Sequence, residues 1–125
     1  MKKAVITSKA PTAIGPYSQA VDCGDTSYFS GQIPLDPASG ELVEGGIAEQ
    51  AEQVMNNLAA VLQAAGLDWP NVVKTTIYLT DLTSFAEVNQ VYARHLVEPF
   101  PARATVGVSS LPKGALVEIE ALARR

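Results

Sequence analysis

The first third of the chain has the pattern of short β-strands. Segments that contain apolar and aromatic residues are separated by glycine, proline and aspartate, which favour turns. The predicted strands span residues 3–7, 17–23 and 27–33. Tyr17 begins the second strand, and Gly24-Asp25 turns the chain into the third. Ser30 and Gly31 lie inside the third strand, where a glycine marks a bulge or a close approach of the backbone to a ligand.

Two segments have the periodicity of amphipathic helices. In residues 47–65 one apolar stripe is formed by Ile47, Ala51, Val54, Met55, Leu58, Leu62 and Ala65. Gly66 follows as the expected end of this helix. A second helix is predicted from Ser84, which has capping-box spacing to Glu87. Its apolar stripe comprises Phe85, Val88, Tyr92 and Leu96.

Asn89 lies on or beside the stripe of the second helix. A buried amide without hydrogen-bond partners would cost about 1–3 kcal/mol, so Asn89 needs a polar neighbour. It either satisfies a neighbouring loop or lines a polar pocket, and the pattern leaves both interpretations open.

The remaining strands complete an α+β fold. Residues 72–80 form a β-branched strand, and residues 101–123 form two strands joined by a Leu-Pro-Lys-Gly turn. The order of two or three strands, helix, strand, helix and two strands predicts a mixed sheet with both helices on one face. We expect a single domain over residues 1–125. Two helices cannot cover both faces of such a sheet, so we expect self-association through the uncovered face.

The last two strands carry the candidate chemistry. Glu118 and Glu120 are two residues apart and therefore share one face of their strand. If the strands pair as a hairpin with Val108 opposite Ala115, Arg103 lies across from Glu120. One interpretation is a structural ion pair on a half-exposed face. The other is a site that binds an anionic substrate through Arg103 and transfers a proton through a glutamate.

Composition and charge narrow the range of partners. The net charge of −4 and the lack of a basic run argue against nucleic-acid or membrane surfaces. No stretch has the apolar length of a membrane span or a signal peptide, so we expect a cytoplasmic protein. One cysteine and one histidine cannot build a usual zinc site. We interpret Cys23 as a small buried strand residue and His95 as favouring the C-terminal dipole of its helix.

Several motifs together identify the chain as similar to a known family. The chain resembles the RidA (YjgF-type) reactive-intermediate deaminases in six segments. These are AIGPYSQAV (13–21), SGQIPLDPASGEL (30–42), QAAGL (63–67), VVKTTIYLTDLTSFAEVNQVY (72–92), FPARATV (100–106) and VEIEALA (117–123). The resemblance implies a chorismate-mutase-like α+β fold and a homotrimer whose sheets enclose a central barrel. It also implies three sites in the clefts between adjacent subunits, with no metal and no cofactor.

The resemblance further implies an activity and a set of site residues. The activity is hydrolysis of 2-imino acids or their enamine tautomers, such as 2-iminobutanoate and 2-iminopropanoate, to 2-oxo acids and ammonia. Arg103 would bind the substrate carboxylate, and Glu118 would be the acid/base residue that positions a water molecule. The pocket would be lined by Tyr17, Ser30, Gly31, Asn89 and Thr105. Many relatives have a cysteine where this chain has Thr105. We therefore expect no thiol chemistry at this position, and the substrate preference can differ from that of those relatives.

The sequence has two alternative functional interpretations. The first is a non-catalytic trimer that binds small carboxylates in the same clefts or holds unfolded proteins on exposed apolar surface. The second is a ribonuclease or translation inhibitor, which the acidic charge and the lack of a basic aromatic patch disfavour.

Overall fold

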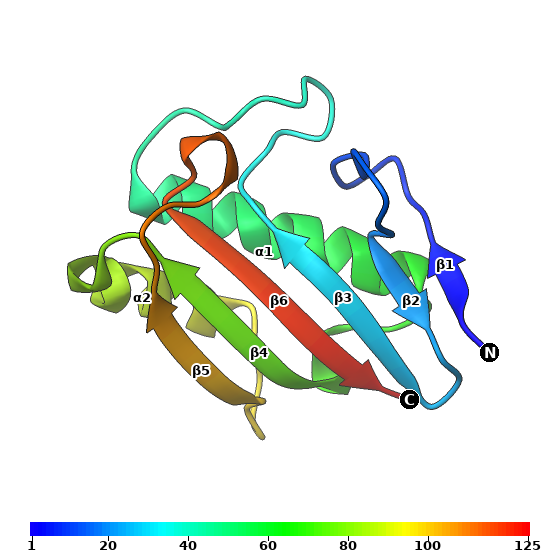
Figure 1. The fold of residues 1–125 in the computed structure, drawn as a ribbon. Helices are drawn as coiled ribbons and strands as arrows, with labels where there is room; N and C mark the ends of the chain where they lie inside the picture. The colour runs from blue at the N-terminus through cyan, green and yellow to red at the C-terminus, as the bar shows by residue number, and fades with distance from the viewer.

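A computed structural model describes residues 1–125 as one six-stranded sheet with two α-helices behind it (Figure 1). The elements are β1 (Lys3–Val5), β2 (Ala20–Asp22), β3 (Thr26–Gln32), α1 (Ile47–Ala64), β4 (Val72–Leu79), α2 (Phe85–Arg94), β5 (Ala102–Gly107) and β6 (Val117–Arg124). Three single 3₁₀ turns lie at Trp69–Asn71, Leu82–Ser84 and Pro112–Gly114. The predicted α+β class and element order are confirmed. Neither helix is long and apolar enough to cross a membrane.

The sheet has the strand order β1-β2-β3-β6-β4-β5. All neighbours are antiparallel except β4 and β5, which run parallel. The predicted hairpin of the last two strands is therefore wrong, because β4 lies between β5 and β6 (Figure 1). The physical reason is that β4, α2 and β5 form a strand–helix–strand unit, which ordinarily places its two strands parallel and adjacent. Strand β5 therefore pairs with one edge of β4, and β6 pairs with the other edge of β4.

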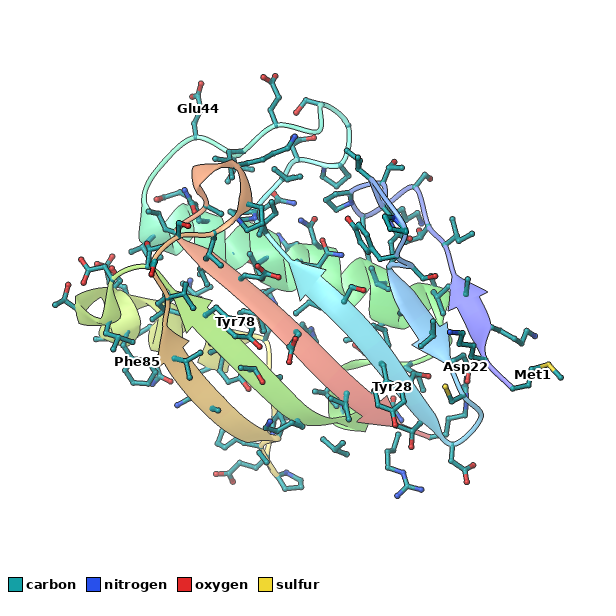
Figure 2. The ribbon with its side chains drawn as sticks, in the orientation of Figure 1. Met1, Asp22, Tyr28, Glu44, Tyr78 and Phe85 are labelled. Carbon is teal, nitrogen blue, oxygen red and sulfur yellow. The ribbon has the colours of Figure 1, made fainter.

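Alternate residues of the central strands divide the sheet into two unlike faces. On β6, Val117, Ile119, Ala121 and Ala123 are buried, whereas the residues between them are partly exposed. The buried face packs against α1 and α2 and forms the core with residues such as Met55, Leu58 and Leu62. No helix covers the opposite face, where Figure 2 shows Tyr28 and Tyr78. The predicted uncovered face is confirmed for the single chain.

Three local predictions are corrected. The second strand begins at Ala20, and Tyr17 lies in the preceding loop. The chain bends there because Gly15 has a φ of +115° and accepts a hydrogen bond from the Tyr17 amide (2.9 Å). Cys23 is exposed next to the β2–β3 turn rather than buried in a strand.

The second helix also begins differently from its prediction. Ser84 has helical backbone angles and its side chain makes no capping hydrogen bond, because the Leu82–Ser84 turn runs directly into α2. Asp81 caps this turn by accepting a hydrogen bond from the Thr83 amide (2.9 Å). At the other end of α2, the His95 Nε2 atom lies 3.0 Å from Glu52 Oε2 and ties the helix to α1.

Candidate active site in two halves

The strand register places Arg103 and Glu118 on opposite faces of the sheet. Arg103 is aligned with Thr75 on β4, and Thr75 is buried beneath the helices. Glu118 is aligned with Tyr78, three residues further along β4, so it points to the uncovered face. Arg103 is therefore not opposite Glu120, whose partner is Thr76. The interpretation as an intrachain Arg103–Glu120 ion pair is wrong for the same reason.

The Glu118 half of the site is a cleft of about 640 Å³ near the carboxyl end of β3. It brings together four of the predicted site residues, namely Tyr17, Ser30, Gly31 and Glu118. Glu120 and Lys113 also line this cleft. Lys113 has a left-handed backbone with a φ of 58°, in the turn that leads into β6.

A β-bulge aims Ser30 and Gly31 at Glu118. The pairing of β3 with β6 shifts its register between Phe29 and Gln32, as a glycine inside a strand predicted. The Ser30 hydroxyl donates a hydrogen bond to the Ser18 carbonyl (2.6 Å), which fixes the bulge to the Tyr17 loop. A Cβ atom on Gly31 would overlap the Glu118 carboxylate. Only glycine therefore allows Glu118 to lie against this part of the backbone.

The environment of Glu118 favours its protonated form. Partial burial raises the pKa of the Glu118 carboxyl above its ordinary value, and the negative charge of Glu120 raises it further. Burial likewise raises the pKa of the Tyr78 phenol, with Glu120 and Glu118 adding to the effect. A carboxyl with a raised pKa exchanges protons closer to neutral pH, which is the property required of a general acid or base.

The Arg103 half of the site is a separate cleft of about 370 Å³ beside α2. Its lining is Asn89, Tyr92, Ala93, Leu96, Phe100, Pro101 and Arg103. The Arg103 Nη1 atom donates a hydrogen bond to Asn89 Oδ1 (2.7 Å). Asn89 therefore lines a polar pocket, which was one of its two interpretations. Thr105 lies on β5 aligned with Ile77, and it lines neither cleft.

The aromatic surroundings of Arg103 were not predicted from the sequence. The Arg103 guanidinium carbon lies 5.2 Å from the ring centroids of both Phe85 and Tyr92. The pattern showed these rings only as part of an apolar stripe. A signal was present, because Phe85, Asn89 and Tyr92 are spaced four and three residues apart and share one helix face. Elsewhere, no three His, Cys, Asp or Glu side chains lie close enough to hold a metal ion.

This mixed sheet, with two helices on one face and a polar cleft on each side, has the architecture of the endoribonuclease L-PSP family. The family model matches residues 7–125, and the chain belongs to this family, which includes the RidA and YjgF proteins.

Individual relatives cover nearly the whole chain. It is 58% identical over 124 residues to "Protein DfrA" of Myxococcus xanthus, covering 98% of this chain and 95% of the relative. It is 54% identical over 123 residues to the 2-iminobutanoate/2-iminopropanoate deaminase of Bos taurus, covering 98% and 90%. The crystal structure of E. coli TdcF with bound serine superposes with a TM-score of 0.93, at 41% identity and 98% coverage of both chains.

Proposed function

We propose that this protein hydrolyses 2-imino acids and their enamine tautomers, such as 2-iminobutanoate and 2-iminopropanoate, to 2-oxo acids and ammonia. The observation that carries the proposal is the pair of clefts, one with an arginine and one with a raised-pKa glutamate, in a chain 54% identical to a deaminase of that name. The serine bound to E. coli TdcF supports a ligand with an amino-acid skeleton.

The proposed chemistry uses Arg103 and Glu118 in different roles. The planar guanidinium of Arg103 binds the substrate carboxylate through two parallel hydrogen bonds, which a lysine cannot reproduce. Glu118 accepts a proton from a water molecule as its oxygen adds to the C=N carbon. Glu118 passes this proton to the nitrogen, which gives a carbinolamine. The hydroxyl proton of the carbinolamine then moves to the nitrogen through Glu118 as the C–N bond breaks, so the C=O bond of a 2-oxo acid forms and ammonia leaves. Tyr17, Ser30, Gly31, Asn89 and Thr105 are proposed to line the assembled site.

The site is proposed to form between subunits of a cytoplasmic homotrimer. A 2-imino acid of a few atoms cannot contact Arg103 and Glu118 of one chain, because the sheet separates them. Head-to-tail packing, with the uncovered sheet face of one subunit against the β5 edge and α2 of the next, would bring the Glu118 cleft of one subunit to the Arg103 cleft of its neighbour. The apolar side chains of Tyr28, Val73 and Val106 are exposed in the single chain, which supports burial of part of the uncovered sheet face between subunits.

The alternative is a trimer that binds small carboxylates or holds unfolded proteins without catalysis. Such a protein would retain Arg103-dependent binding of 2-oxo acids, yet its behaviour would not depend on Glu118. We propose no nucleic-acid partner, because the net charge of −4 disfavours phosphate binding.

A coupled assay tests the function directly. An amino-acid oxidase generates 2-imino acids, and release of ammonia is followed with wild type, Glu118→Gln and Arg103→Ala. We expect Glu118→Gln to lower kcat about 10²- to 10⁴-fold, because proton transfer is lost. Arg103→Ala should raise KM about 10- to 100-fold, because charged hydrogen bonds to the carboxylate are lost. Wild-type protein that does not accelerate release would overturn the proposal, and full activity of either variant would remove that residue from it.

A further inference from the structure

Arg103 stands on an exposed edge strand, yet its side chain is held from several directions. Its guanidinium is 5.2 Å from the Phe85 and Tyr92 ring centroids and donates a hydrogen bond to Asn89 (2.7 Å). All three partners come from α2. A long arginine side chain loses considerable rotamer freedom when it is fixed in this way, so a held arginine needs an explanation.

The partners of Arg103 hold the guanidinium without neutralising it. The ion pairs between an arginine and a carboxylate in the chain are Arg94–Glu52 and Arg125–Asp22. Arg103 belongs to neither of them, although a carboxylate is the usual partner of a fixed arginine. Aromatic faces and an amide oxygen attract a cation but carry no formal charge. The positive charge of Arg103 therefore remains available to an anion that enters the cleft.

Phe85, Asn89 and Tyr92, which we call the arginine clamp, are held in place by contacts with the core. The Tyr92 hydroxyl lies 2.7 Å from the Thr75 Oγ1 atom, and both residues are buried. Thr75 is aligned with Arg103 across the β4–β5 pair, so the ring is fixed to the strand that adjoins the arginine. Helix α2 is tied to α1 by the contact between His95 and Glu52.

We propose that Phe85, Asn89 and Tyr92 are positioning residues that orient Arg103 toward the substrate carboxylate while preserving its full positive charge. This inference rests on the proposed function, because it concerns the same arginine. It assigns Asn89 to the arginine rather than to the substrate. It also predicts that a carboxylate at position 89 is harmful, even though it would bind Arg103 more strongly than the amide does.

The test measures KM, kcat and the affinity for 2-oxobutanoate, a stable carboxylate with the shape of the product, by titration calorimetry. Phe85→Leu keeps an apolar side chain but removes the aromatic face. It should raise KM and the Kd for 2-oxobutanoate together by about 3- to 30-fold, the range of a cation–π contact, and leave kcat within about twofold. Phe85→Tyr keeps the face and should restore wild-type values.

The Asn89→Asp variant tests whether Asn89 orients Arg103 while preserving its charge or only supports the fold. If charge preservation matters, this nearly isosteric change should raise KM and Kd about tenfold or more, because the new carboxylate competes with the substrate for Arg103. If Asn89 only supports the fold, the stronger bond should leave KM and Kd unchanged and raise the melting temperature.

Val61→Ala is the control for lost core packing. Val61 is fully buried on α1 and lines neither cleft. This variant should be less stable than wild type, with unchanged KM and Kd. If the wild-type protein turns over substrate but Phe85→Leu and Asn89→Asp leave KM and Kd unchanged, the clamp is overturned and the proposed deaminase activity stands. Binding of 2-oxobutanoate that both variants weaken, without wild-type turnover, would support the clamp and overturn the deaminase. A wild type that neither binds nor turns over would overturn both.

Discussion

Glu118 and Glu120 illustrate how one residue sets the acidity of another. They point to the same face of β6, where the negative charge of Glu120 opposes ionisation of Glu118. Tyr78 faces them from β4, and Lys113 lines the same cleft from the preceding turn. Burial is the larger cause of the raised Glu118 pKa, and Glu120 is the second. Glu120 thus tunes Glu118 without itself contacting the substrate in the proposed reaction.

Replacing Glu120 by Gln should therefore lower the pKa of Glu118. If ionised Glu118 is the base, the acid limb of the pH profile of kcat/KM should move to lower pH, because Glu118 then loses its proton earlier. The measurement is the pH dependence of kcat/KM between pH 4 and pH 9, which spans roughly the range in which carboxyl groups and histidine titrate.

Glu44→Gln is the control for that experiment. It removes the same charge at an exposed position in the loop before α1, where the side chain points away from the sheet (Figure 2). Its profile should coincide with that of wild type. An acid limb that stays in place, or moves to higher pH, in Glu120→Gln would contradict the assignment of Glu120.

At the scale of elements, one buried amide holds the loop that carries Tyr17. The Gln19 side chain accepts a hydrogen bond from the Thr7 amide (2.8 Å) and donates to the carbonyls of Thr7 (3.0 Å) and Pro11 (2.8 Å). Gln19 is only 4% exposed. These bonds fix the segment between β1 and β2, which forms one wall of the Glu118 cleft.

Gln19→Ala should detach this segment from the sheet. We expect the free energy of unfolding to fall by about 1–3 kcal/mol, because buried backbone groups lose their partners. Amide hydrogen exchange should rise in residues 7–17, and urea unfolding gives the stability. Gln90→Ala, at an exposed position of α2, is the matched control and should change neither quantity. Unaltered exchange in residues 7–17 would show that the loop is held by other contacts.

Some elements of the fold could be predicted from the sequence and others could not. Helix α1 was predicted to within one residue, because its apolar stripe and the closing Gly66 are local signals. The β5–β6 hairpin was wrong, because a strand's partner depends on which edges are free after α2 packs. The bulge at Ser30-Gly31 was foreseen from the glycine. The aromatic neighbours of Arg103 were not foreseen, because they come from a helix that the predicted pairing did not place beside it.

At the scale of the whole molecule, the proposed sharing of the site between subunits can be tested by mixing variants. Glu118→Gln keeps a functional Arg103 cleft, and Arg103→Ala keeps a functional Glu118 cleft. At substrate well below the wild-type KM each variant alone should be nearly inactive. Co-expression of the two should then restore about a quarter of wild-type activity, because random assembly joins two intact halves at about one interface in four. The measurement is the specific activity of the purified mixed oligomer, with its mass determined by sedimentation.

The control combines two changes in the same cleft. Glu118→Ala removes the carboxylate outright, so its co-expression with Glu118→Gln leaves no interface with an intact Glu118 half. This mixture should stay inactive. If the mixture of Glu118→Gln and Arg103→Ala assembles like wild type in sedimentation but recovers no activity, the proposed shared site is contradicted.

The sequence by itself determined the helices, the α+β class and the candidate residues Arg103 and Glu118, because periodicity, turn residues and motifs act over a few positions. Only the tertiary structure decided that these two residues lie on opposite faces. Strand register and the insertion of β4 between β5 and β6 are set by packing between distant segments. Because neighbouring strand residues alternate between faces, that packing divides one set of candidate residues into two half-sites.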